Sequence, residues 1–173
     1  MRDLFVGSTV DKVLRKLTRP LLIVKREPEV PYQKILIPAD FSHSSVQAMK
    51  FAMRIAPHAH ITALHAFEVP LHAKLHSAGI DYKLMQFYEA EVHAQKKMEM
   101  RRFVSELETS DISVTGIVEQ GAAFDVIRKK TEVLAADLII IGKHGQSELD
   151  EMLLGGVTMR VIQDTDCDVL VVG

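Results

Sequence analysis

Short runs of consecutive apolar residues alternate along the chain with longer stretches in which apolar residues recur every three or four positions. The short runs are rich in aliphatic side chains and predict buried strands. The periodic stretches predict amphipathic helices. The expected strands cover residues 34–40, 60–69, 112–121, 137–142 and 167–172, and the expected helices cover residues 42–56, 84–108, 123–136 and 154–165.

Strands that alternate with helices favour parallel βαβ units, and strands that are apolar throughout favour a sheet covered on both faces. We therefore predict an α/β fold with a five-stranded parallel open sheet and helices on both faces. Ligands of such sheets bind beyond the carboxyl ends of the strands. Asp40 and Gly142 each end a predicted strand, so both are expected to face one crevice. The apolar residues of the longest helix are expected to form one core stripe: Met85, Phe87, Met98, Met100 and Phe103.

The beginning of the chain repeats its end. Residues 7–25 align without a gap on residues 155–173, at a constant offset of 148 residues. Both segments read as a glycine-led helix followed by an aliphatic strand, and self-similarity at a fixed spacing indicates a repeat. The identical positions are Gly7 with Gly155, Val13 with Val161, Leu22 with Leu170, and Val24 with Val172.

This repeat predicts the domain organisation. Residues 1–26 are expected to be the closing helix and strand of a truncated preceding copy, residues 27–33 a linker, and residues 34–173 the full domain. A helix and a strand cannot bury their own apolar faces, and a bare strand edge invites pairing. We therefore expect Leu21 to Val24 to dock along the last-strand edge of this chain or of a neighbouring copy.

Composition narrows the class of protein. The chain has 173 residues, of which 47% are hydrophobic and 25% charged, which is typical of a globular domain. A net charge of −2 gives no reason to expect a nucleic-acid partner. The single cysteine, Cys167, permits no internal disulfide and fits a core position in a reducing compartment. No apolar run approaches the roughly 20 residues of a membrane span, so a cytoplasmic protein is expected.

Two pairs of glycines flank the beginning of the last predicted helix. Gly142 and Gly145 follow a strand, and Gly155 and Gly156 open the helix. Glycine lets a ligand approach the backbone closely, and free N–H groups at a helix N-terminus attract anions. The spacing is that of neither a Walker A loop nor a Rossmann fingerprint. The residues alone leave two alternatives, a phosphate loop or a set of tight turns.

The glycine spacing, together with the segments "ILIPAD", "ALHAFEVP", "EQGAAFDVI" and "AADLIIIGKHG", resembles the universal stress protein family across residues 33–173. This resemblance implies an adenine-nucleotide hydrolase-like sheet that often dimerises through its last strand. It also implies ATP, with or without Mg²⁺, as a ligand in some members and no nucleotide in others. The residues that would bind the nucleotide are Pro38, Ala39, Asp40, Ala66, Ile141, Gly142, His144, Gly145, Gly155, Gly156, Val157 and Thr158, with Asp40 on the adenosine and the glycine loops on the phosphates.

The chain departs from the family motif at one position. Gly156 stands where the family has Ser or Thr. Loss of that hydroxyl removes a charge-assisted hydrogen bond worth about 1.5–3 kcal/mol. Thr158, in the first helical turn, is a candidate to replace it, so ATP binding is expected to be weakened but retained.

Three functional hypotheses follow from these residues. The leading hypothesis is a stress-response module in which ATP biases a conformation or assembly, with residues 146–154 arching over the site. The alternative is a nucleotide-free interaction module that acts as a homodimer. Slow ATP hydrolysis is the least favoured, because no motif places a nucleophile or second carboxylate beside Asp40. The pairs His58/His60 and His72/His76 have metal-compatible spacing, yet surface histidines are the simpler interpretation.

Overall fold

The computed structural model describes residues 19–27, 30–69, 82–107, 112–143, 145 and 155–173. Strands and helices alternate from residue 34 onward, as the hydrophobic pattern predicts. In chain order the elements are β1 (Leu21–Ile23), β2 (Lys34–Pro38), α2 (His43–Ile55), β3 (His60–Phe67), α4 (Tyr82–Ser105), β4 (Val114–Gln120), α5 (Ala123–Leu134), β5 (Leu138–Gly142), α6 (Gly156–Asp164) and β6 (Asp168–Val172).

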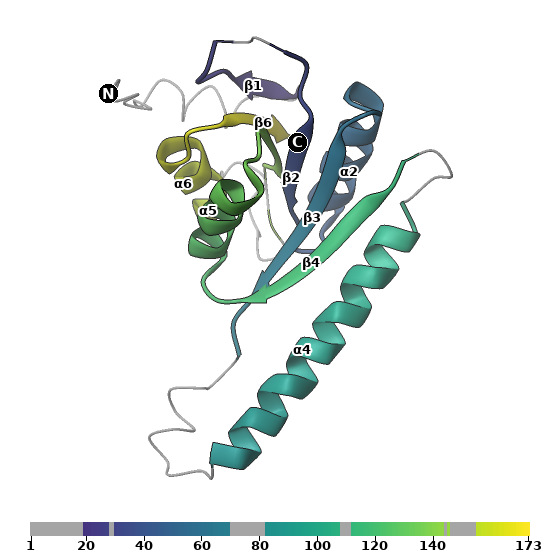
Figure 1. Ribbon diagram of the computed structural model, residues 1–173, viewed down its shortest axis with the longest axis vertical. Helices are drawn as coiled ribbons and strands as arrows, with labels where there is room; N and C mark the ends of the chain where they lie inside the picture. Colours follow the sequence, from purple (N-terminus) through teal and green to yellow (C-terminus); the bar gives the residue numbers. More distant parts are fainter. Residues whose placement is uncertain (1–18, 28–29, 70–81, 108–111, 144, 146–154) are drawn as a thin grey trace.

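One mixed sheet of six strands runs through the molecule in the order β1-β6-β5-β2-β3-β4 (Figure 1). The strands from β2 onward pair in parallel, whereas β1 pairs with β6 in antiparallel fashion. The prediction of a purely parallel five-stranded sheet is therefore corrected by the additional strand at one edge. From β2 the chain moves outward to β3 and β4, and from β5 it moves the other way to β6. The neighbours β2 and β5 thus define the topological switch point of the sheet.

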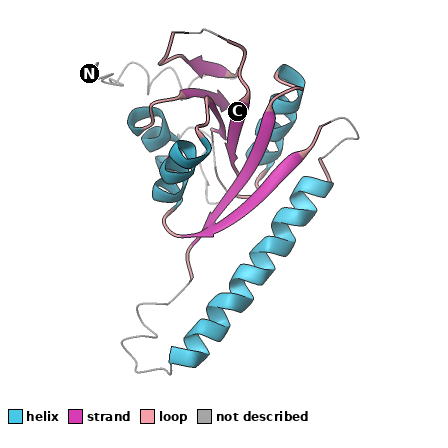
Figure 2. Ribbon diagram, viewed as in Figure 1, coloured by secondary structure: helices cyan, strands magenta, loops and turns pink. Residues whose placement is uncertain are grey.

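Helices cover both faces of the sheet (Figure 2). On one face α2 and α4 bury a cluster that includes Met49, Met100 and Phe103, and on the other α5 and α6 bury a cluster that includes Ile127 and Val161. Successive strand residues point to opposite faces. The centres of β2 and β5 are almost fully buried because they contribute to both clusters.

The edge position of β1 answers part of the N-terminal prediction. Leu21 lies opposite Val171, Leu22 opposite Leu170, and Ile23 opposite Val169, all within one chain. The predicted docking of Leu21 to Val24 therefore occurs on the last-strand edge of the same chain, over Leu21–Ile23. The helix expected between Gly7 and Lys16 lies outside the described residues, and the truncated-copy interpretation stays a prediction.

The long helix α4 differs from the prediction in what it buries. Met85, Met100 and Phe103 are buried, as expected for a core stripe. Phe87 and Met98 are 67% and 69% exposed, so their inclusion in that stripe was wrong. The physical reason is helical geometry: Phe87 lies two residues from Met85, and Met98 lies two residues from Met100, so each points to about the opposite side of the helix. Figure 1 shows in addition that the N-terminal half of α4 extends past the end of the sheet.

Among the described residues, no helix is long and apolar enough to cross a lipid bilayer.

Candidate functional site

A cavity of about 330 Å³ opens at the carboxyl ends of β2 and β5, at the switch point of the sheet. Its floor comes from the ends of the strands, and its rim comes from the N-terminal turns of α2, α5 and α6. The side chains and backbone that line it belong to Pro38, Ala39, Asp40, Ser45, Leu64, Ala66, Ala123, Ile127, Ile141, Gly142, Gly145, Gly155, Gly156, Val157 and Thr158.

Asp40 is held in a fixed orientation at one side of this cavity. Its Oδ1 accepts a hydrogen bond from the Ser45 hydroxyl at 2.6 Å and another from the Ser42 backbone N–H at 3.0 Å. The Asp40 backbone N–H in turn donates to Ser45 Oγ at 3.0 Å. Ser42 is also the N-cap of α2. These bonds tie the carboxylate to the helix N-terminus, where negative charge is favoured.

The backbone around Asp40 is braced by His65. The ring Nδ1 of this buried residue donates to the Ala39 carbonyl oxygen at 2.8 Å. The Phe41 ring lies 4.3 Å from the His65 ring, centroid to centroid, and Phe41 itself has a φ of 66°. A positive φ is strained for a bulky residue, so surrounding contacts must hold it. Burial lowers the pKa of His65, which favours the neutral ring.

The N-terminus of α6 forms the opposite side of the cavity. Its N-cap, Gly155, supplies no side-chain hydrogen bond, and its own N–H donates to the Lys143 carbonyl oxygen at 3.2 Å. The first bond inside the helix runs from the Met159 N–H to the Gly155 carbonyl oxygen. Helix geometry consequently gives the N–H groups of residues 156–158 no intrahelical acceptor. Backbone donors of this kind, with the helix dipole behind them, form an anion site.

Thr158 does not take over the role of the missing motif hydroxyl. Its Oγ1 donates to the Gly142 carbonyl oxygen at 3.0 Å, and its side chain is buried. The hydroxyl hydrogen is therefore used inside the protein, where it ties the first turn of α6 to the end of β5. At Gly156, an added Cβ would meet no atom of the described residues within 4 Å. The cavity thus has room where the motif expects a serine or threonine side chain.

Gly145 lies close to the Asp40 carboxylate in the cavity. A Cβ atom added at this residue would lie 2.9 Å from Asp40 Oδ2, closer than real Cβ contacts come. A glycine is required for this approach, because any side chain would displace the carboxylate or the loop. Gly145, the second glycine of the motif, therefore lies directly beside the Asp40 carboxylate.

The wall between Asp40 and α6 is apolar. Ile127 from α5 and Ile141 from β5 are almost fully buried, and Ala66 at the end of β3 packs against the same cluster. An apolar slot between a fixed carboxylate and a group of N–H donors suits a flat ring that carries hydroxyl and anionic groups at its far end.

The cavity gathers the predicted site residues that the structure describes. Every one of them lines it, while His144 and residues 146–154 lie outside the described residues. Sequence reasoning missed Ser45, Leu64, Ala123 and Ile127. A local signal existed for Ser45, since it follows the N-cap by three residues. None existed for Ala123 or Ile127, whose place depends on how α5 packs.

Metal binding finds no support in the part of the chain that the structure describes, where no three His, Cys, Asp or Glu side chains come together. His72 and His76 fall outside that part. Cys167 is buried, as expected of a core residue, and burial raises the pKa of its thiol.

Comparison with known proteins gives consistent matches. Residues 31–173 match the universal stress protein family. Universal stress protein MJ0577 of Methanocaldococcus jannaschii is 32% identical over 155 residues, which cover 83% of this chain and 96% of that protein. Its solved structure superposes with a TM-score of 0.70 at 30% identity, over 83% of this chain and 96% of that chain.

Two further structures share the fold. A universal stress protein of Archaeoglobus fulgidus superposes with a TM-score of 0.67 at 19% identity, and the match covers 99% of this chain and 57% of that longer chain. A universal stress protein in complex with cAMP superposes with a TM-score of 0.51 at 23% identity, over 83% of this chain and 98% of that chain.

Proposed function

This chain belongs to the universal stress protein family, and we propose that its cavity binds an adenine nucleotide, ATP, as the signal of a stress-response regulatory module. One observation carries the proposal. The fixed carboxylate of Asp40 and the N-terminus of α6 border a single cavity, with an apolar wall between them. A nucleoside phosphate presents a group for each of the three: ribose hydroxyls for the carboxylate, a flat base for the apolar wall, and an anion for the helix N-terminus.

Each part of the ligand has a partner. Asp40 would accept hydrogen bonds from the ribose hydroxyls, which is a task for a carboxylate already oriented by Ser45. The adenine ring would lie against Ala66 and Ile127. The phosphates would accept hydrogen bonds from the N–H groups at the beginning of α6, where the helix dipole adds positive potential.

Binding at this site has a physical route to the edge of the sheet. α6 begins at the proposed phosphate site and leads directly into β6, the strand that pairs with β1. A ligand that fixes the first turn of α6 would therefore restrain the strand that follows it. This coupling is a proposal, and its test is a comparison of molecular mass in solution with and without saturating ATP.

A titration of ATP against thermal unfolding tests the nucleotide site. Ligand at about 100 times its dissociation constant adds roughly 2.7 kcal/mol of stability, enough to displace the unfolding midpoint clearly. The displacement is expected to vanish in Asp40→Ala, which removes the carboxylate. It is also expected to vanish in Gly145→Val, whose side chain would occupy the space beside that carboxylate. cAMP and adenosine, titrated in parallel, reveal how much of the stabilisation depends on the phosphate chain. No displacement at millimolar ATP would refute the proposal.

A second function is favoured by a specific observation. Gly156 lacks the motif hydroxyl, and the Thr158 hydroxyl is bonded to Gly142 instead of pointing free into the site. Both features reduce the number of phosphate donors. A nucleotide-free interaction domain of the same fold is therefore the candidate that replaces the first if the titration gives no displacement.

A further inference from the structure

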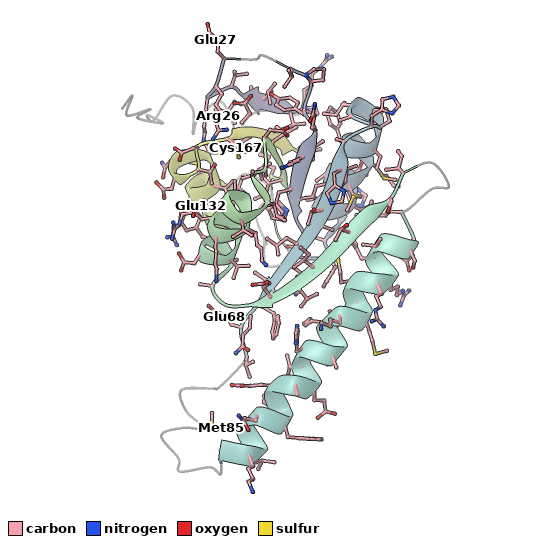
Figure 3. All side chains as sticks on the ribbon, viewed as in Figure 1. Arg26, Glu27, Glu68, Met85, Glu132 and Cys167 are labelled. Atoms are coloured by element: carbon pink, nitrogen blue, oxygen red, sulfur yellow. The ribbon has the colours of Figure 1, made fainter. Side chains whose placement is uncertain are left out.

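The longest helix carries apolar side chains on the side that faces away from the sheet. α4 packs on β3 and β4 through buried residues such as Met100. On its far side, Leu84, Phe87 and Met98 are 59%, 67% and 69% exposed, so the described part of the chain leaves them largely uncovered. Figure 3 shows Met85 in the first turns of this helix, which lie beyond the end of the sheet. Single exposed apolar residues are common, so the spacing decides whether these three belong together.

Their spacing is that of a coiled-coil seam. Steps of three and four residues alternate along this side of α4, which is the heptad pattern of positions that face a second helix. A straight helix drifts by only about 20° per heptad, so such a series stays on one side over the length of α4. We call these exposed residues the α4 stripe, and its members are Leu84, Phe87, Glu91, Ala94, Met98 and Arg101.

Two members of the α4 stripe are charged. Glu91 and Arg101 are exposed, and neither forms an ion pair with another residue that the structure describes. A charge at a seam position favours the pairing in which it meets an opposite charge and disfavours the pairing in which it meets a like one. These two residues therefore indicate which orientation of a second helix the stripe fits.

The charges match a second copy of α4 in antiparallel orientation. In a parallel pair, each seam residue would face its own counterpart, so Glu91 would meet Glu91 and Arg101 would meet Arg101. In an antiparallel pair, Glu91 can lie opposite Arg101 of the other copy. The two-fold axis then passes at the level of residue 96, and the contact between opposite charges occurs twice.

The same register produces complementary apolar layers. Beside the two-fold axis, the small Ala94 side chain faces the flexible Met98 side chain of the other copy. Further out, Phe87 faces Ser105 of the other copy, a small residue that leaves room for the ring. From residue 87 to residue 105 the shared seam is about 27 Å long, at 1.5 Å per residue. Moving one helix by a heptad in either direction would separate the opposite charges.

We propose that the α4 stripe binds α4 of a second copy of this chain, as an antiparallel pair of helices with Glu91 opposite Arg101 and Met98 opposite Ala94. α4 packs on β3 and β4, at the other end of the sheet from β6. The surface is therefore separate from the last-strand edge, and it is also separate from the cavity at the carboxyl ends of β2 and β5.

Sedimentation equilibrium of the full chain tests whether the stripe associates. The weight-average mass of the unmodified chain is expected to rise over tens to hundreds of micromolar. Met98→Lys places a charge beside the two-fold axis and is expected to weaken this association at least about tenfold. Gln86→Lys adds the same charge at an exposed position of α4 outside the stripe and is the matched control. Equal association of the two variants, or an unmodified chain that stays a monomer throughout, would overturn the proposal.

Charge reversal tests the orientation. Glu91→Arg and Arg101→Glu each place like charges opposite one another, so each variant is expected to associate at least about tenfold more weakly than the unmodified chain. The double variant Glu91→Arg/Arg101→Glu exchanges the two charges, has the net charge of the unmodified chain, and is expected to regain its association. A parallel pair would give a different result, because each single reversal would replace one like-charged contact by another.

A mixture of the two single variants tests the contact between chains directly. Each reversed charge then meets an opposite charge in the other chain, so a mixed dimer is expected. Each variant alone at the same total concentration is the control. Circular dichroism and thermal unfolding confirm that the variants fold, which their exposed positions favour. A double variant or a mixture that associates no better than the single variants would refute the proposed pairing, and equal association in every variant would assign the association to another surface.

Discussion

The hydroxyl of Thr158 donates to the carbonyl oxygen of Gly142 at 3.0 Å, inside the protein. This bond joins the first turn of α6 to the end of β5, so it fixes the geometry of the glycine loops from within. It also engages the hydroxyl hydrogen that a phosphate oxygen would otherwise accept. The proposed phosphate site consequently relies on backbone N–H groups, and the open space at Gly156 becomes the obvious place to strengthen it.

Gly156→Ser is expected to tighten ATP binding by about 10- to 100-fold, since one hydrogen bond to a charged group contributes about 1.5–3 kcal/mol. The new side chain has room on the side of the described residues, none of which has an atom within 4 Å of its Cβ position. Isothermal titration calorimetry measures the change. Gly156→Ala is the control, with the added carbon but no hydroxyl, and equal affinities in the two variants would exclude a hydroxyl contact with the phosphates.

Ser45→Ala is expected to weaken ATP binding by about tenfold and to destabilise the fold by about 1–2 kcal/mol, because Asp40 loses its shortest hydrogen bond. Ser44→Ala, on the neighbouring position of the same helix, is the matched control. Calorimetry and urea unfolding of both variants separate binding from stability. If Ser45→Ala binds ATP as the unmodified chain does, Ser45 has no part in orienting the carboxylate.

Some features of the fold and of the candidate site can be predicted from the sequence, and others cannot. The strands and the crevice follow from local pattern, because apolar runs mark buried strands and Asp40 and Gly142 end two of them. The direction of the Thr158 hydroxyl does not follow, since it depends on how α6 sits over β5. The exposure of Phe87 could have been predicted, because it lies two residues from the buried Met85 and so on about the opposite side of the helix.

The N-terminal strand illustrates the same limit. The repeat predicted that Leu21 to Val24 would seek a last-strand edge, and it left open whether that edge belongs to this chain or to another. The pairing of β1 with β6 of its own chain depends on tertiary contacts that no local pattern encodes, including the hydrogen bonds from Lys25 and Tyr32 to Asp168.

Asp168→Asn is expected to lower the free energy of unfolding by about 1.5–3 kcal/mol at neutral pH, because charge-assisted hydrogen bonds become neutral ones. Burial alone would raise the pKa of Asp168, but the hydrogen bonds from Tyr32 and from the N–H groups of Lys25 and Arg26 hold it below its usual value. The contribution of the Asp168 carboxylate to stability is therefore complete above about pH 5, and it is lost as pH falls below the unfolded-state pKa of about 4.

Urea unfolding between pH 7 and pH 3 measures this contribution. The unmodified chain should lose stability more steeply in acid than Asp168→Asn, and the two curves should approach each other at the lowest pH. Tyr32→Phe removes a single hydrogen bond and is expected to fall between them at neutral pH. Parallel curves for the unmodified chain and Asp168→Asn would contradict a lowered pKa at this carboxylate.

His65 gives the fold a second, separate pH dependence. Burial lowers its pKa, although the hydrogen bond to the Ala39 carbonyl oxygen opposes that effect. Because the folded state favours the neutral ring, the contribution of His65 to stability is complete above the unfolded-state pKa of about 6.5 and declines as pH falls toward the lower folded-state pKa.

His65→Asn keeps a side-chain N–H donor near the position of Nδ1 but cannot titrate. It is expected to be less stable at pH 7, since the contact with the Phe41 ring is lost, and to show a flatter change between pH 7 and pH 5. Ala39 and Asp40 line the cavity proposed to bind ATP, so ATP affinity measured over the same range reports whether protonation of His65 also disturbs the site. An unchanged slope of stability in His65→Asn would mean that other groups titrate in this window.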